Sequence, residues 1–217
     1  MQIHILSENN SVLNHFLGQI RNVNVHNDSM RFRRNIERIG EIMAYELSKE
    51  LHYSTIEIQT PLGIKKTTEI KDQLVLCSIL RAGLPLHMGF LNYFDSAENG
   101  FVSAYRHHPN NDAYFDIKVE YQAIADINNK NLLLIDPMLA TGQSIVAVFN
   151  RLVERGTPKE IHIAVTIAAP EGIAFLEKHL PHNCHLWIAA LDEKLDEKSY
   201  IVPGLGDAGD LAFGEKL

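Results

Sequence analysis

Short apolar stretches alternate with longer amphipathic stretches along most of the chain. Several of the apolar stretches have the length of buried strands: 74–80, 101–105, 132–135, 161–168 and 185–190. Continuous apolar runs of this length are typical of strands covered on both faces. Apolar residues recur with helical spacing between several of them, at 85–93, 144–155 and 170–179. This alternation predicts an α/β fold with a doubly wound, mainly parallel sheet and helices on both faces.

The first third of the chain follows a different pattern. A long amphipathic helix is expected to begin at Asp28 or Ser29, since either side chain can cap it. Arginines near its start are most simply interpreted as a solvated face: Arg31, Arg33, Arg34 and Arg38. Farther on, Pro61-Leu62-Gly63 separates two strand-like segments, so we expect a small β-arm at about 55–70.

Composition limits the classes of protein to which the chain can belong. Its 217 residues suit a single domain, 1–217, and its formal net charge of −7 argues against nucleic acid as a partner. The only cysteines are Cys77 and Cys184, so no disulfide framework is implied and a cytoplasmic location is the simplest expectation. No segment has the length and apolarity of a membrane span, so no membrane partner is expected.

The strand at 132–135 leads directly into a loop suited to an anionic ligand. Asp136 ends this strand, and Thr141, Gly142 and Ser144 lie just before the next helix. Their hydroxyls and backbone amides occupy the position where a helix dipole favours phosphate. An ordinary strand–loop–helix connection explains the segment equally well when it is considered alone, and its glycines match neither common nucleotide-binding loop. The loop therefore has to be judged together with other features.

Two more strand ends and the C-terminal segment supply such features. Ligands of doubly wound sheets bind beyond the carboxyl ends of the strands, which is where we expect Arg81 and Arg106. Each arginine alone is more simply a surface charge. The segment 200–210 (YIVPGLGDAGD) combines three glycines with two acids, which predicts a tight loop rich in exposed backbone donors and acceptors. The alternative for this segment is a flexible tail.

Three segments together resemble the defining motifs of uracil phosphoribosyltransferases, a family of the type I phosphoribosyltransferase superfamily. They are 79–84 (ILRAGL), 136–142 (DPMLATG) and 200–210, in the family's order and spacing. The resemblance covers nearly the whole chain, from 31–33 to 213–216. It implies transfer of phosphoribosyl from 5-phospho-α-D-ribose 1-diphosphate to uracil, which gives UMP and diphosphate in pyrimidine salvage. It also implies Mg²⁺ as cofactor, a C-terminal base-binding hood at about 200–210, and a homodimer or higher homo-oligomer.

The resemblance further implies roles for individual residues. Asp136 and Arg106 would be catalytic. Phosphoribosyl diphosphate would be bound by two strand ends, by the loop at 136–144, which we call the phosphate loop, and by the C-terminal loop. The residues are Arg81, Arg106, Asp136, Pro137, Met138, Leu139, Ala140, Thr141, Gly142, Gln143, Ser144 and Asp207. Uracil would be bound by the C-terminal loop: Ile201, Gly206, Asp207 and Ala208. Substrate oxygens and water would hold most of the Mg²⁺ coordination, as this hard ion prefers.

The chain departs from the family pattern at two places. Gln143 stands where many relatives have glycine, and His107-His108-Pro109 follows Arg106 in place of acidic and amide residues. The first affects the expected backbone of the phosphate loop, and the second affects how a polar surface loop at 107–112 closes.

Three alternative interpretations stay open at this point. An RNA-binding regulator of pyrimidine genes on the same fold would need a basic face, for which only the four arginines at 31–38 are available. A catalytically silent domain would have lost its substrate motifs, which are all present. A metal site is the third alternative, although the spacing of its candidate ligands matches no structural zinc pattern: His179, His182, Cys184 and His185.

Overall fold

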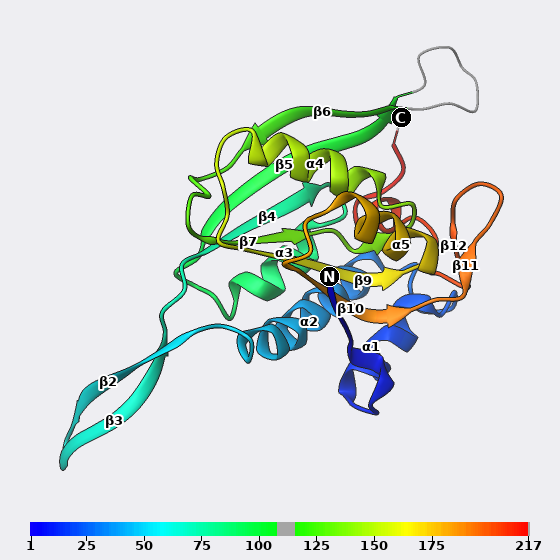
Figure 1. Cartoon of the computed structure of the whole chain (residues 1–217). Coiled ribbons are helices and arrows are strands. Elements are labelled where there is room, and N and C mark those ends of the chain that lie inside the picture. The colour runs from blue at the N-terminus through cyan, green and yellow to red at the C-terminus, as the bar shows by residue number, and fades with distance from the viewer. Residues whose placement is uncertain (108–115, 217) are drawn as a thin grey trace.

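The computed structural model describes residues 1–107 and 116–216, and the side chains of 105–107, 116 and 117 lie outside this description. Within the described part, a central sheet has the strand order β1-β10-β9-β7-β4-β5-β6, with the short β8 paired to β9 (Figure 1). The strands are β1 (Gln2–Ile5), β4 (Leu74–Leu80), β5 (Glu98–His107), β6 (Asp116–Ala123), β7 (Asn131–Ile135), β8 (Met138–Leu139), β9 (Glu160–Ala168) and β10 (Cys184–Leu191). Every described pairing in the sheet is parallel except β5 with β6. The predicted mainly parallel sheet is confirmed.

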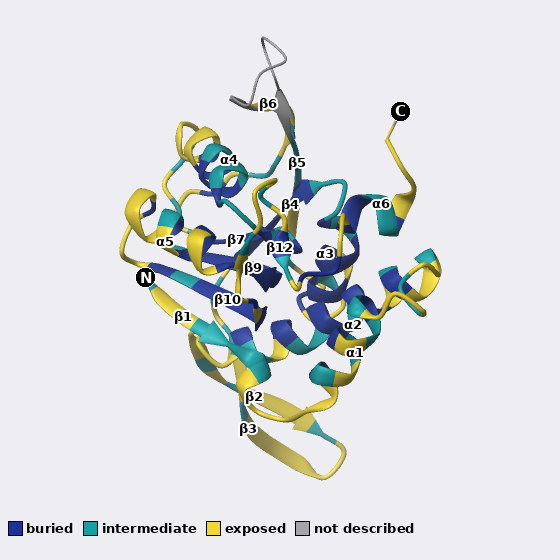
Figure 2. Ribbon diagram, turned by 90° about the vertical axis from the view of Figure 1, so that its right-hand side faces the viewer, coloured by how far each residue is buried: buried dark blue, intermediate teal, exposed yellow. Residues whose placement is uncertain are grey.

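Helices cover both faces of the sheet (Figure 2). One face carries α4 (Gln143–Val153) and α5 (Pro170–His179), and the other carries α1 (Val12–Arg21), α2 (Ser29–Ser48), α3 (Leu84–Leu91) and α6 (Ala208–Phe213). A 3₁₀ turn, η1 (Leu6–Glu8), precedes α1. As predicted, Asp28 caps α2, where its carboxylate accepts a hydrogen bond of 3.1 Å from the Arg31 amide. The predicted doubly wound α/β arrangement is therefore confirmed.

The central strand β7 shows why its sequence is continuously apolar. Leu132 and Leu134 belong to the core under α4 and α5, whereas Leu133 and Ile135 belong to the core under α1, α2 and α3. Successive side chains of a strand point to opposite faces, so a strand with two covered faces needs an apolar residue at every position. The two cores hold the carboxyl end of β7 rigidly in the middle of the sheet.

Two hairpins lie outside the central sheet. β2 (Tyr53–Thr60) and β3 (Gly63–Ile70) pair antiparallel, with Thr60 opposite Gly63 across the predicted turn. This arm extends away from the sheet and its helices (Figure 1). The second hairpin, of β11 (Lys194–Leu195) and β12 (Ile201–Val202), leads into α6. The β-arm was predicted, whereas the second hairpin was not.

The sheet is wider than the sequence indicated. β1 and β6 were not predicted: β1 is a short edge strand, and β6 has no continuous apolar run, because polar and apolar residues alternate along it. β5 also continues through Arg106 to His107, whereas the apolar pattern placed Arg106 after the strand. The predicted polar loop at 107–112 lies outside the described residues from 108 onward. Among the described helices, none is long and apolar enough to cross a membrane.

Candidate active site

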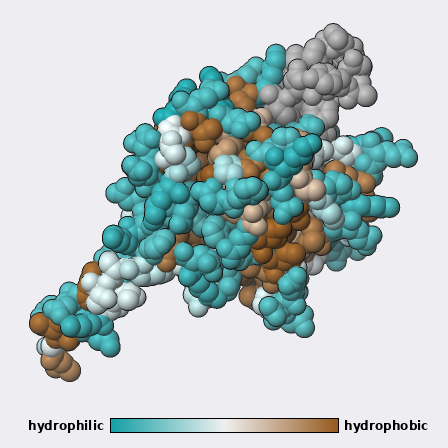
Figure 3. Space-filling view, viewed as in Figure 1, coloured by the Kyte–Doolittle hydropathy of each residue, from teal (hydrophilic) through white to brown (hydrophobic). Residues whose placement is uncertain are grey.

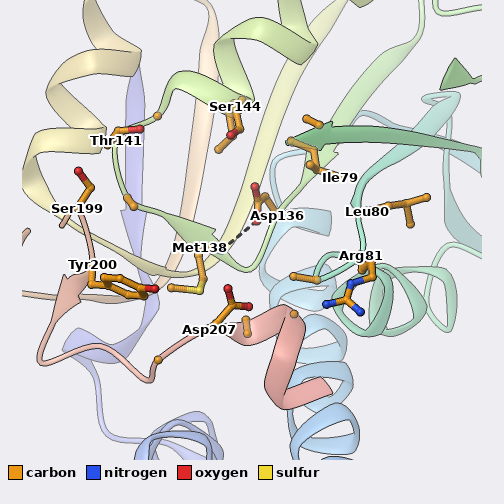
Figure 4. A pocket seen from close by; sticks show the side chains of 18 of the residues that line it. Ile79, Leu80, Arg81, Asp136, Met138, Thr141, Ser144, Ser199, Tyr200 and Asp207 are labelled. Atoms are coloured by element: carbon orange, nitrogen blue, oxygen red, sulfur yellow. Dashed lines mark hydrogen bonds between the residues drawn. The ribbon is translucent and has the colours of Figure 1, made fainter. Parts of the chain in front are cut away.

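A cavity of about 560 Å³ opens beyond the carboxyl ends of β4 and β7. Figure 4 shows Asp136, Thr141 and Ser144 around one part of this cavity, and Arg81, Asp207 and Tyr200 around another. Its lining comes from the two strand ends, the start of α4 and the C-terminal segment: Ile79, Leu80, Arg81, Ala82, Ala104, Asp136, Met138, Ala140, Thr141, Gly142, Ser144, Ile145, Lys198, Ser199, Tyr200, Gly206, Asp207, Ala208, Gly209 and Lys216. The cavity lies where ligands of doubly wound sheets bind.

The phosphate loop is shaped by one glycine and one short strand. Gly142 caps α4 with a φ of 79°, a left-handed conformation that glycine adopts without strain. It has no side chain with which to satisfy the first amides of α4, so these donors stay available to an anion. Leu139 is fully buried in β8, and its carbonyl accepts a hydrogen bond of 2.9 Å from the Ala169 amide. The loop is thus anchored on the sheet side and open on the cavity side.

Asp136 directly follows β7 and is held by its backbone. Its amide donates to the Ala164 carbonyl at 3.1 Å, and its side chain accepts from the Met138 amide at 3.2 Å. Burial raises the pKa of Asp136 to about 7, and the hydrogen bond from the Met138 amide opposes this rise. The carboxyl group therefore changes its charge near neutral pH, at the point where the phosphate loop begins.

Arg81 follows β4 and points toward α6. Its Nη2 donates to Asp210 Oδ1 at 2.9 Å and to the Gly214 carbonyl at 3.2 Å. Its Nε is buried without a partner. Close packing explains Gly83 in this loop, since an added Cβ would lie 2.5 Å from Ser78 Oγ. The guanidinium therefore joins the end of β4 to the C-terminal helix, with donor capacity left over.

The C-terminal segment closes another side of the cavity with backbone and short side chains. Gly206 has a φ of 95°, and Asp207 caps α6 by accepting a hydrogen bond of 3.0 Å from the Asp210 amide. Gly206, Asp207 and Ala208 all line the cavity. Ile201 is buried at the start of β12 and packs into the core under α1 and α2. Apart from the Asp207 carboxylate, the lining residues at 206–209 are glycine and alanine, which bring no polar side chain to the cavity.

Most of the residues predicted for the site lie around this one cavity. Ten of them line it: Arg81, Asp136, Met138, Ala140, Thr141, Gly142, Ser144, Gly206, Asp207 and Ala208. Pro137, Leu139, Gln143 and Ile201 do not line it, and the first two are buried behind the loop. The side chain of Arg106 lies outside the described residues, although Ala104 of the same strand reaches the cavity.

Sequence reasoning missed several lining residues. Lys198, Ser199 and Tyr200 come from the turn between β11 and β12, and Lys216 comes from the C-terminal segment. Ser199 has a φ of 63°. Tyr200 was available as a signal, because it opens the C-terminal motif. The lysines resemble ordinary surface charges in the sequence, and only the fold brings them to the cavity.

The charges around the cavity suit a phosphorylated ligand and a hard cation. The described lining includes three cationic residues, Arg81, Lys198 and Lys216, and two carboxylates, Asp136 and Asp207. Carboxylate oxygens suit Mg²⁺. The described residues contain no group of three or more His, Cys, Asp or Glu side chains placed to hold a metal ion.

The structure also places the other two residue clusters singled out in the sequence, and among the described residues the histidine and cysteine cluster forms no group of three or more side chains that could hold a metal ion. In the histidine and cysteine cluster, His179 Nδ1 contacts the Phe175 carbonyl at 2.8 Å, and Cys184 is buried with a free thiol. The arginines near the start of α2 are engaged locally. Arg31 pairs with Asp28, Arg33 donates to the Ala212 carbonyl, Arg34 pairs with Glu37 and Glu41, and Arg38 donates to Asn35. Arg31 and Arg34 stay about half exposed beside their acidic partners.

Comparison with known proteins gives one consistent result. The model of the family described as uracil phosphoribosyltransferase matches residues 7–215. A protein of that name from Porphyromonas gingivalis is 51% identical over 217 residues, which is 100% of both chains. Another from Shouchella clausii is 39% identical and covers 99% of each chain. In structure, the chain is similar to the AQ2163 protein from Aquifex aeolicus, with a TM-score of 0.87, 26% identity and 98% coverage of both chains.

Proposed function

The chain belongs to the uracil phosphoribosyltransferase family, and from this membership we propose how its cavity divides between two substrates. The enzyme is a pentosyltransferase that forms UMP and diphosphate from uracil and 5-phospho-α-D-ribose 1-diphosphate, a salvage reaction. One observation carries the proposal: two different surfaces line the same cavity. They are the start of α4, whose first amides have no side-chain cap, and the C-terminal segment, where most of the lining residues have small side chains. The first suits the sugar phosphate, and the second suits the base.

The phosphoribosyl half lies at the carboxyl end of β7. The amides at the start of α4, with the hydroxyls of Thr141 and Ser144, bind the 5-phosphate. Met138 and Ala140 line the cavity beside them. Pro137, Leu139 and Gln143 shape the loop without lining the cavity, since Leu139 is anchored in β8 and Gln143 starts the helix. Asp136 accepts hydrogen bonds from the ribose hydroxyls and acts as a catalytic residue by orienting the sugar. Asp207 faces the same half from α6.

The diphosphate half lies near the end of β4. Departure of diphosphate leaves positive charge on the ribose and negative charge on the leaving group, so positioning and electrostatic stabilisation dominate catalysis. Arg81 and Arg106 bind the diphosphate through guanidinium groups, and Arg106 is the second catalytic residue. Two lysines that line the cavity, Lys198 and Lys216, add positive charge to the site as a whole. Mg²⁺, when bound with the diphosphate, neutralises part of its charge.

Uracil binds against the C-terminal segment. Its alternating carbonyl and N–H groups match backbone amides and carbonyls, which Gly206, Asp207 and Ala208 present at the cavity. Ile201 acts from behind, since it is buried and fixes the start of β12. Cytosine would leave mismatched donors and acceptors unpaired in this half, which is the physical basis for its exclusion.

The assembly that we propose is a homodimer or a higher homo-oligomer of this chain. The β2–β3 arm supports it, because this two-stranded hairpin extends from the body with Ile58, Leu62 and Ile64 exposed near its tip (Figure 3). An isolated two-stranded hairpin is only marginally stable in water, so contact with a partner subunit would stabilise it. A cytoplasmic location, which the two unpaired cysteines suit, stays a prediction.

Paired substitutions test the division of the cavity. Thr141→Val removes one hydroxyl from the phosphate half, and Gly206→Ala forces a side chain onto a residue with a φ of 95° in the uracil half. With UMP formation measured in Mg²⁺, Thr141→Val should raise the KM for phosphoribosyl diphosphate about tenfold and leave the KM for uracil within twofold. Gly206→Ala should raise the KM for uracil about tenfold and leave the KM for phosphoribosyl diphosphate within twofold. A reversed pattern, or equal effects on both constants, would contradict the division.

A further inference from the structure

A well-ordered ion pair outside the cavity joins the first helix to the C-terminal segment. Arg21, the last residue of α1, donates from its two terminal nitrogens to the two carboxylate oxygens of Asp192, at 2.6 and 2.9 Å. The Asp192 side chain is 4% exposed, and that of Arg21 is 22% exposed. A bidentate pair of this kind fixes the orientation of both groups. The two residues lie 171 positions apart in the sequence.

Both side chains also hold the backbone of Gly204. The Nη1 of Arg21 donates to the Gly204 carbonyl at 2.9 Å, and Asp192 Oδ2 accepts from the Gly204 amide at 3.0 Å. Both polar backbone groups of one residue are therefore fixed by the same ion pair. We call the three residues Arg21, Asp192 and Gly204 the clamp.

Gly204 lies in a turn that permits little adjustment. Its φ is 63°, and an added Cβ would lie 2.1 Å from the Ile201 carbonyl oxygen. Val202, two residues before Gly204, is fixed as well, because its carbonyl accepts a hydrogen bond of 3.0 Å from the Glu193 amide. On its other side, Leu205 is buried in the core, so a displacement of Gly204 would strain the segment in both directions.

We infer that Arg21 and Asp192 are positioning residues for uracil recognition. Through Gly204 they hold residues 201–208 in the conformation that forms hydrogen bonds with uracil. This inference rests on the proposed function, which assigns uracil to that segment. Neither side chain lines the cavity, so each acts through Gly204 and touches no substrate. The clamp meets β9 through its backbone, because the Asp192 amide donates to the Ala168 carbonyl at 2.8 Å and Ala168 pairs with Leu139 of β8. Changing the side chain of Arg21 or Asp192 leaves this backbone contact in place. Loss of the ion pair should therefore affect one substrate selectively.

A second ion pair in the same chain provides a matched control. Asp72 pairs with Lys159 at 2.6 Å, and its side chain is 5% exposed, close to the 4% of Asp192. Asp72 also accepts a backbone hydrogen bond, of 2.7 Å from the His52 amide. This pair lies at the base of the arm and lines no part of the cavity. Asp72→Asn thus removes a comparable buried charge without a connection to residues 201–208.

The test compares Asp192→Asn, Arg21→Lys and Asp72→Asn by steady-state kinetics of UMP formation, with thermal unfolding of each variant. Asp192→Asn should raise the KM for uracil about tenfold, while kcat and the KM for phosphoribosyl diphosphate stay within twofold. Arg21→Lys keeps the charge but loses the bidentate geometry, so it should raise the KM for uracil by a smaller factor. Asp72→Asn should lower the unfolding temperature and change neither KM.

Other results would contradict either the inference on the clamp or the proposed position of uracil. An unchanged KM for uracil in folded Asp192→Asn, or an equal rise of both KM values, would overturn the inference. An equal rise in Asp72→Asn would show a general effect of lost stability and would overturn it too. If Asp192→Asn does not fold, Arg21→Lys decides by the same criterion. Gly206→Ala separates the two proposals: if it leaves the KM for uracil unchanged, then the assignment of uracil to this segment has failed.

Discussion

Asp136, which we propose orients the ribose, also lowers the stability of the protein at neutral and higher pH. Its pKa lies at about 7, above the value of 3.8 that is usual for aspartate, because burial penalises the charged carboxylate. An acid with a raised pKa in the folded state lowers stability as the pH rises from its unfolded value to its folded value. For Asp136 this loss takes place between about pH 4 and pH 7 and then stays constant. Its magnitude is at most about 4 kcal/mol.

Replacing Asp136 with asparagine should therefore stabilise the protein at high pH. We expect the free energy of unfolding of Asp136→Asn to exceed that of the parent by about 1–4 kcal/mol at pH 8, and to match it within about 0.5 kcal/mol near pH 3.5. Urea unfolding at both pH values measures the difference. Turnover should fall at least about tenfold, since the amide is a weaker acceptor for the ribose hydroxyls. A stability difference that is the same at both pH values would refute this account.

At the scale of elements, the phosphate loop depends on a helix that does not line the cavity. Gly172 of α5 lies so close to the loop that an added Cβ would be 2.3 Å from the Ala140 carbonyl oxygen. Interiors pack too densely to absorb such an overlap without a backbone shift. The contact couples the position of α5 to the shape of the loop.

Gly172→Ala should consequently impair phosphoribosyl diphosphate binding from outside the site. We expect a several-fold rise in its KM and a loss of about 1–3 kcal/mol in stability, measured by kinetics and urea unfolding. Gly18→Ala is the control, because Gly18 is also helical but has nothing within 4 Å of an added Cβ. That change should gain up to about 1 kcal/mol from helix propensity, with unchanged kinetics. Normal substrate affinity in Gly172→Ala would show that the loop does not depend on α5.

For the molecule as a whole, the arm is the feature that the fold of one chain leaves unexplained. Its turn residue Leu62 is 99% exposed and the neighbouring Ile64 is 67% exposed. Apolar side chains gathered at the tip of a projecting hairpin are typical of an interaction surface. The proposed homo-oligomer would bury them.

A charge at the arm tip should weaken that assembly. We expect Leu62→Asp combined with Ile64→Asp to shift the mass measured by sedimentation toward that of one chain at micromolar concentration. Burying an unpaired carboxylate in an interface is costly, whereas an exposed one costs little. Val23→Asp, at a position 66% exposed in the turn before α2, is the matched control and should leave the mass unchanged. An unchanged mass in the arm variant would place the interface elsewhere.

The sequence by itself determined the features that depend on residues near one another in the chain. The apolar run Leu132–Ile135 predicted a doubly covered strand, because side-chain alternation is a local property of the backbone. The change to helical spacing after Gly142 predicted the start of a helix for the same reason, and α4 begins at Gln143. Pro61-Leu62-Gly63 predicted the turn of the arm, which lies between Thr60 and Gly63.

Only the tertiary structure decided which distant residues meet. Arg81 pairs with Asp210 across 129 positions, and Arg21 pairs with Asp192 across 171. No local sequence pattern predicts either pair. The edge strand β1 likewise depends on β10, because four residues cannot specify a strand without a partner. Such contacts follow from how complete layers pack, so they exist only once the sheet and its two helical layers have assembled.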